Sequence, residues 1–102
     1  MGTLIVQTLT DRNSIAAFVA SAEGMPALGL GLANFKLRVT LPGADGSHLV
    51  IKSVEPSKLR GFYVLDLAPV SPAPRRRGLY VFDLVVEHGE NRGEAMSSVI
   101  LT

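Results

Sequence analysis

The sequence predicts an all-β fold, a sandwich of about seven antiparallel strands, and three observations support this prediction. Runs in which apolar and polar residues alternate recur along the chain, as they do in strands with one buried face. Segments rich in Gly, Pro, Asn and Asp separate these runs at the spacing of a sandwich. Alternating strands and helices are not seen, which argues against a doubly wound sheet. The expected strands span 3–10, 15–22, 34–41, 48–54, 61–68, 79–87 and 94–101.

The first two strands differ in how clearly they are indicated. The run 3–10 is rich in β-formers and ends at a polar turn. The run 15–22 contains several alanines, and periodicity alone also permits a short helix there, capped by Asn13 or Ser14. We favour a strand, because the elements that follow are all β. The segment 23–33 is broken by glycines and a proline, yet it is unusually apolar for a loop.

The central strands alternate more cleanly. In 34–41 the apolar side chains share one face and the polar ones share the other, as in a half-buried antiparallel strand. The run 61–68 is similar, and prolines after it exclude a central strand over 69–74. The sets expected to face inward are Phe35, Leu37, Val39 and Leu41 in the first run, and Tyr63, Leu65 and Leu67 in the second.

The strongest pattern is the predicted hairpin near the end of the chain. The run 79–87 is filled with β-branched and aromatic residues. Its inward set is expected to be Tyr80, Phe82, Leu84 and Val86. Turn-forming residues then occupy 88–93, and 94–101 is the expected return strand. Ser97 and Ser98 blur the alternation in that strand, so the sequence does not decide which of its faces is buried.

Two short phrases resemble the immunoglobulin-like sandwich superfamily. Gly78-Leu79-Tyr80-Val81-Phe82 is similar to the Gly-x-Tyr-x-Cys run of the sixth strand, with Phe82 at the Cys position and Tyr80 as the corner tyrosine. Gly24-Met25-Pro26-Ala27-Leu28-Gly29-Leu30 is similar to the Gly-x-Pro-Val-x-Gly-Leu phrase that joins the second and third strands of many bacterial surface sandwiches. The resemblance implies an immunoglobulin-like or fibronectin-type-III-like Greek-key module without a disulfide. It also implies an extracytoplasmic or cell-surface setting.

Composition sets limits on the protein class. The 102 residues predict one domain, 1–102, either whole or excised from a larger protein, and 47% hydrophobic with 19% charged residues suits a folded core. A net charge of +1 argues against a nucleic-acid partner. The absence of cysteine excludes disulfides, thiolate metal sites and cysteine nucleophiles. No apolar run is long enough for membrane insertion, and no signal peptide is visible.

We expect no catalytic residue, cofactor or metal. His48 and His88 are the only histidines, and they fall at strand ends that need not be close. No Gly-x-Ser-x-Gly elbow occurs, and Gly29-x-Gly31 lacks the context of a dinucleotide site. The remaining acidic candidates are Asp45, Glu87, Glu90 and Glu94, and their spacing matches no calcium-binding loop. Asp66 and Asp83 are expected to keep the outer faces of their strands wet.

Two surface features remain as candidates for binding. Three adjacent arginines can hold a phosphate or carboxylate, so their loop is a candidate site for an anion or an acidic partner: Arg75, Arg76 and Arg77. The outward faces of two strands are also too apolar for free solvent, which marks a candidate partner-contact face. Its members are Phe62, Val64, Leu79, Val81 and Val85. A sister subunit, a neighbouring domain or the apolar loop 25–32 could cover it, and a one-residue slip in register would exchange the faces.

These features favour a non-catalytic module that mediates protein–protein contact or spacing, as part of a larger surface, secreted or assembly-forming protein. A carbohydrate-binding or accessory domain of an enzyme is a second possibility. It is disfavoured because the chain has no Trp and both tyrosines are expected to face inward. A small stand-alone subunit of a homo-oligomer is the third. Binding to glycans and concentration-dependent association are the respective tests.

Overall fold

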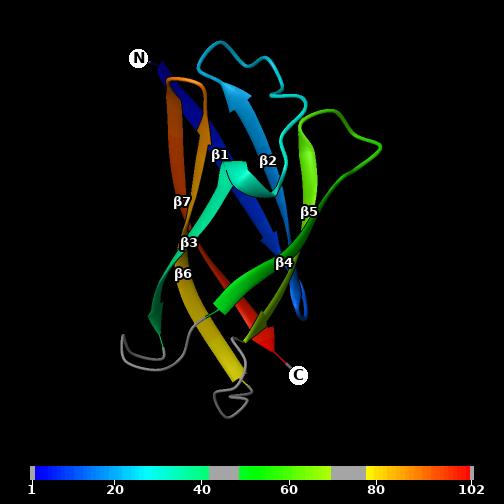
Figure 1. Cartoon of the computed structure of the whole chain (residues 1–102), viewed down its shortest axis with the longest axis vertical. Helices are drawn as coiled ribbons and strands as arrows, with labels where there is room; N and C mark the ends of the chain where they lie inside the picture. Colours follow the sequence, from blue (N-terminus) through cyan, green and yellow to red (C-terminus); the bar gives the residue numbers. More distant parts are fainter. Residues whose placement is uncertain (1, 42–48, 70–77, 102) are drawn as a thin grey trace.

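The structure is a computed structural model in which residues 2–41, 49–69 and 78–101 are described. Its seven strands form one curled sheet with the shape of a half-barrel (Figure 1). The all-β prediction is therefore confirmed, including the strand preferred over a helix for the alanine-rich run. The elements are β1 Gly2–Thr10, β2 Ser14–Ser21, the 3-10 turn η1 Leu32–Asn34, β3 Phe35–Leu41, β4 Leu49–Pro56, β5 Phe62–Pro69, β6 Gly78–His88 and β7 Asn91–Leu101.

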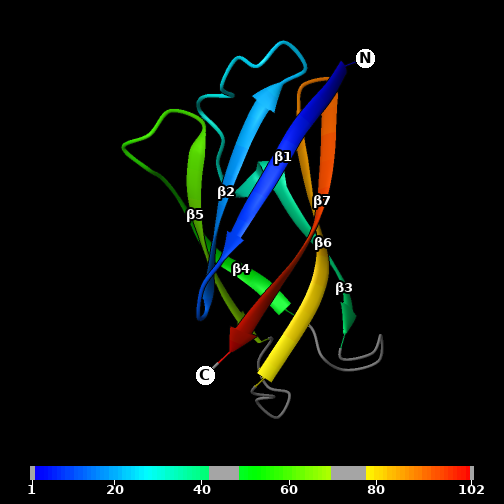
Figure 2. The ribbon, with the colours of Figure 1, turned by 180° about the vertical axis from the view of Figure 1, so that it is seen from behind.

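The strand order is β3-β6-β7-β1-β2-β5-β4, so β3 and β4 are the two edges. Every pair in this order is antiparallel except β1 with β7, which run in the same direction (Figure 2). The expectation of a purely antiparallel sheet is wrong for this pair. The two strands pair at Gly2–Asn91 and Thr3–Arg92, and an isolated bridge joins Arg12 to Ile100 at the other end.

At Gly93 the backbone of β7 lies very close to that of β1. A Cβ atom built on this glycine would overlap the carbonyl oxygen of Leu4 and would lie 2.9 Å from the Leu4 carbonyl carbon. These are backbone atoms of a paired strand, so they cannot turn aside as a side chain could. The absence of a side chain at residue 93 is therefore what lets β1 continue the sheet beyond β7.

The β6–β7 hairpin is tighter than the sequence predicts. His88 pairs with Asn91, so the turn consists of Gly89 and Glu90 alone. Gly89 has a φ of 64°, a conformation that glycine adopts without strain at the first position of a two-residue hairpin turn. The predicted turn 88–93 was too long, because its polar residues lie on the exposed ends of two paired strands rather than in a loop.

Both edge strands are irregular. The register of β3 against β6 shifts between Val39 and Leu41, and that of β4 against β5 shifts between Ile51 and Ser53. Such irregularities bend a strand and interrupt its ladder of hydrogen bonds. Lys52, the extra residue on β4, is exposed.

The core lies on the concave side of the sheet. The inward sets expected on β5 and β6 are all buried. On β2 the inward residues are Ile15, Ala17 and Val19. Ile15 and Val19 are β-branched and favour a strand, and this preference outweighs the preference of the alanines for a helix. On β7 the ambiguity is resolved, because Ser97 is 7% exposed and Ser98 lies on the outer face.

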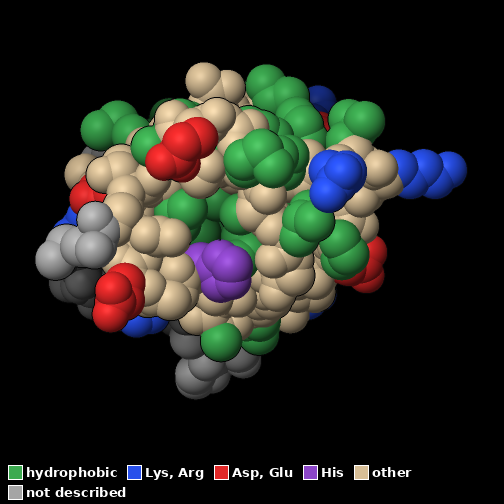
Figure 3. Space-filling model, turned by 90° about the horizontal axis from the view of Figure 1, so that it is seen from above, with side chains coloured by type: hydrophobic (Ala, Val, Ile, Leu, Met, Phe, Trp, Pro, Cys, Tyr) green, Lys and Arg blue, Asp and Glu red, His purple; other side chains and the backbone are tan. Residues whose placement is uncertain are grey.

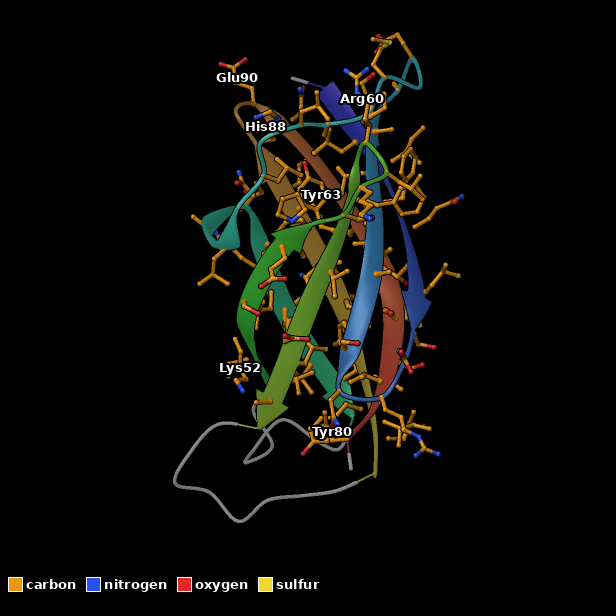
Figure 4. All side chains as sticks on the ribbon, turned by 90° about the vertical axis from the view of Figure 1, so that its right-hand side faces the viewer. Lys52, Arg60, Tyr63, Tyr80, His88 and Glu90 are labelled. Carbon is orange, nitrogen blue, oxygen red and sulfur yellow. The ribbon has the colours of Figure 1, made fainter. Side chains whose placement is uncertain are left out.

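The apolar segment between β2 and β3 crosses the end of the half-barrel that carries the β6–β7 turn (Figure 4). Leu30 is buried in the core, which explains why this loop is apolar. The hydroxyl of Tyr63, which points into the interior (Figure 4), donates to the carbonyl oxygen of Ala27 at 2.6 Å and accepts from the amide of Leu30 at 3.3 Å. The loop ends at η1, where the side-chain amide of Asn34 donates to the carbonyl oxygen of Glu87 at 2.8 Å.

Candidate contact surface

The outer face of β1, β2 and β5 is apolar over several adjacent positions. The register sets Leu9 beside Ala16 and Ala16 beside Val64 across three strands. In the next outward row, Phe18 pairs with Phe62, and their ring centroids are 4.7 Å apart at an interplanar angle of 43°. Tilted aromatic pairs at this separation attract one another. These apolar side chains are therefore neighbours on one surface, and the exposed residues Gln7 and Glu55 lie at the ends of the same two rows.

A groove runs along one side of this surface. β1 and β7 are joined only near their ends, so they diverge between them. The resulting groove has a volume of about 650 Å³ and includes Met96 of β7 in its lining. At this divergence the hydroxyl of Thr8 donates to the Ser97 hydroxyl at 2.9 Å, which satisfies the buried serine. None of the nine residues that line the groove carries a charge.

We call this surface the apolar face, and we define it by Leu9, Ala16, Phe18, Phe62, Val64 and Met96. Two of its members protrude strongly, because Leu9 is 69% exposed and Met96 is 74% exposed. Val64 is 40% exposed. Burial of such large, exposed apolar side chains against another surface lowers the free energy of the system.

Near the β6–β7 turn, the outer face of β3, β6 and β7 has a different character, because ion pairs cross it. Lys36 contacts Glu87 at 2.9 Å, and Arg38 contacts Glu94 at 2.9 Å and Asp83 at 3.6 Å. The hydrogen bond and positive charge of Lys36 hold the pKa of the Glu87 carboxyl below its usual value. Exposed pairs of this kind add little stability, but they keep this part of the sheet hydrated.

The structure separates the five residues of the predicted contact face into two groups. Phe62 and Val64 lie together on the apolar face. Leu79, Val81 and Val85 are on β6, and three strands stand between β6 and β5 in the sheet order, so the five residues do not form one surface. Val85 is only 6% exposed, between Lys36 and Glu94 in the register, and cannot meet a partner. Leu79 is 54% exposed and pairs with Ile100.

Sequence reasoning missed four members of the apolar face, namely Leu9, Ala16, Phe18 and Met96. Each is on a strand that was expected, and each belongs to the outward set of that strand. What the sequence lacks is the order of strands in the sheet, which brings β1, β2, β5 and β7 together. A single outward apolar residue on one strand is common and needs no explanation. Outward apolar residues on four neighbouring strands together form an exposed apolar patch.

The other candidate residues do not assemble into a site in the described part of the chain. His88 is exposed beside the β6–β7 turn (Figure 4), and no three His, Cys, Asp or Glu side chains within 2–41, 49–69 and 78–101 are placed to hold a metal ion. Seen from above, this end of the molecule is hollowed and hydrophobic side chains line the hollow (Figure 3). Asp45, His48 and the arginine loop 75–77 lie outside the described residues.

The described ranges contain no helix of the length and apolarity needed to cross a bilayer. Family models, curated proteins and solved structures were each compared with the chain, and none of them matches. The surface itself is therefore the basis for a functional assignment.

Proposed function

We propose that this chain is a non-catalytic, immunoglobulin-like module that makes protein–protein contacts through its apolar face. The strand order supports the immunoglobulin-like part of the proposal. Immunoglobulin sandwiches of the constant type place strands A, B, E and D in one sheet and C, F and G in the other. With the present strands lettered in chain order, β4-β5-β2-β1 corresponds to D-E-B-A, and β7-β6-β3 to G-F-C. The Gly-x-Tyr-x-Phe run then falls on strand F, where the resemblance expects it.

The observation that carries the contact role is the difference between the two outer faces. One has cross-strand ion pairs that satisfy its charged groups on the molecule itself. The other presents Leu9, Met96 and a Phe18–Phe62 pair around an uncharged groove. Protein-binding surfaces have apolar and aromatic centres depleted of charge, and the apolar face has this composition. A partner that covers it removes exposed apolar area from water, which is the main driving force of association.

Photo-crosslinking in the cells that make the protein tests the contact role. A photoreactive phenylalanine analogue is placed at residue 62 or 96 of the full protein. The matched control places it at residue 36, whose Lys side chain is 67% exposed on the other outer face. We expect discrete adducts from 62 and 96 and none from 36. Equal labelling at all three positions, or no adduct from 62 and 96, would contradict the proposal.

A carbohydrate-binding role has no comparable support. Tyr63 and Tyr80 are 2% and 1% exposed, so neither phenol ring is displayed as a platform for a sugar.

A further inference from the structure

We propose that Met96 is a modification site, at which oxidation by a hydroperoxide converts the thioether to a sulfoxide and prevents binding at the apolar face. This inference rests on the proposed contact function and adds a means of regulating it. Three observations support the assignment: the exposure of Met96, its position beside the groove, and the sulfur content of the chain.

Met96 is open to a reagent in solution. Its side chain is 74% exposed, the highest value of any large apolar residue in the described part of the chain. With hydrogen peroxide, a lone pair of the methionine sulfur attacks one peroxide oxygen, the O–O bond breaks, and water leaves after a proton is transferred. The sulfur is oxidised and the peroxide is reduced, so the step needs no other group of the protein.

The groove gives the added oxygen its effect on binding. Of the nine described residues that line the groove, only Gln7 and Thr8 have side chains that can donate a hydrogen bond. The Thr8 hydroxyl already donates to Ser97. A partner that covers the groove would therefore bury the sulfoxide oxygen among side chains with few free donors. Burial of a polar atom without a hydrogen bond opposes association.

The neighbours of Met96 on β6 and β3 place it at a boundary between polar and apolar surface. The register sets Asp83 beside Met96, and Asp83 forms an ion pair with Arg38 at 3.6 Å. A methionine at this boundary belongs to the apolar lining of the groove. A sulfoxide is polar, so oxidation extends the hydrated part of the outer sheet into the groove.

The sulfur content of the chain provides a control at a second position. The chain has three methionines and no cysteine, and Met1 lies outside the described residues. Met25 is 67% exposed in the loop between β2 and β3, and it does not line the groove. Both Met25 and Met96 are accessible to peroxide, but only oxidation of Met96 changes the apolar face. Reductases that oxidise two thiols to a disulfide and release the oxygen as water make the change reversible.

Crosslinking from residue 62, in cells with and without added hydrogen peroxide, tests the inference. Peptide mass spectrometry of the same samples measures the oxygen gained at each methionine. We expect Met96 to become a sulfoxide and the adduct yield to fall roughly tenfold, the loss expected when one large apolar side chain is no longer buried in the contact. Met96→Leu keeps an apolar side chain without sulfur, so its yield should not respond to peroxide. Met25→Leu should respond as the wild type does.

A polar substitution tests the same effect without an oxidant. Met96→Gln places a polar group at the position of the sulfoxide and should lower the adduct yield in untreated cells, whereas Met25→Gln should not. Circular dichroism of each purified variant, and of the peroxide-treated chain, verifies that it is folded. A residue 96 that stays unoxidised in treated cells, a yield unchanged after its oxidation, or a Met96→Leu chain that responds as strongly as the wild type would overturn the inference.

The untreated cells separate failure of this inference from failure of the proposed function. If residue 62 gives no adduct there, the contact function is wrong and the inference fails with it. If the adduct is present but insensitive to both peroxide and Met96→Gln, the contact module stands and only the role of Met96 is wrong. An adduct that is lost on oxidation of Met96 and retained in Met96→Leu supports both.

Discussion

Gly93→Ala should destabilise the protein by separating β1 from β7. The added methyl group would overlap the carbonyl oxygen of Leu4, which belongs to the backbone of the neighbouring strand. To accommodate it, β1 must move away from β7 where the two strands pair at Gly2–Asn91 and Thr3–Arg92. This contact is the main link between the two halves of the half-barrel at that end, so its loss affects the whole sheet.

The expected magnitude follows from two opposing terms. Forcing a methyl group into a packed site typically costs about 1–3 kcal/mol. Replacing glycine by alanine also restricts the unfolded chain, which returns roughly 0.4–1 kcal/mol. The net loss of unfolding free energy is then about 1–2 kcal/mol, which lowers the melting temperature of a domain of this size by about 5–15 °C.

Thermal and urea denaturation followed by circular dichroism measure this loss. Gly31→Ala is the matched control, because Gly31 has a φ of −130° and no atom lies within 4 Å of the position of its added Cβ. The control should be neutral or slightly stabilised. If Gly93→Ala melts with the control, β1 and β7 are not in the close contact described, and the continuous curled sheet is wrong.

Three further predictions address the loop, the ion pairs and the buried outer valine. Tyr63→Phe removes two hydrogen bonds to the loop between β2 and β3 and should lower the unfolding free energy by about 1–3 kcal/mol. Faster amide exchange over residues 23–31 is the local readout. Lys36→Met should raise the pKa of Glu87, as followed by NMR titration. Because that pKa is lowered in the folded state, the small stabilisation from the pair is present above pH 4.5 and is lost as the pH falls through the folded pKa. Val85→Ala should cost about 1–3 kcal/mol of stability and leave association unchanged, because the side chain is buried. A Val85→Ala chain of normal stability but weaker association would restore Val85 to the contact surface.

The strands were predictable because each carries its own evidence. Alternation along β6 identifies Tyr80, Phe82, Leu84 and Val86 as inward, and all four are buried. The limits of the β6–β7 turn were not predictable from composition. Arg92 and Glu94 have the polarity of turn residues, but they contact each other on the outer surface of a paired strand. A polar residue on an exposed strand end and a polar residue in a turn differ only in backbone pairing, which local sequence does not contain.

The apolar face was partly predictable for a related reason. Phe62 and Val64 were recognised because they interrupt the polar side of one strand. Val85 looks equivalent in the sequence, yet its neighbours across β3 and β7 cover it. Conversely, Leu9 and Met96 can be assigned to the same surface only when β1 and β7 are known to be adjacent. Whether an outward residue is exposed depends on its own strand and on the two strands beside it in the sheet. The local sequence specifies only the strand to which the residue belongs.

The irregular edges of the sheet bear on how the protein behaves when it is concentrated. An unpaired edge strand can form backbone hydrogen bonds with another copy of the chain and so extend the sheet. Repeated extension of this kind produces fibrils. Here the register breaks at Val39–Leu41 on β3 and at Ile51–Ser53 on β4, and the extra residue at the second break is an exposed lysine. Sideways growth is therefore interrupted at both margins of the half-barrel. The irregular edges therefore limit growth of the sheet even though the outer face exposes large apolar side chains.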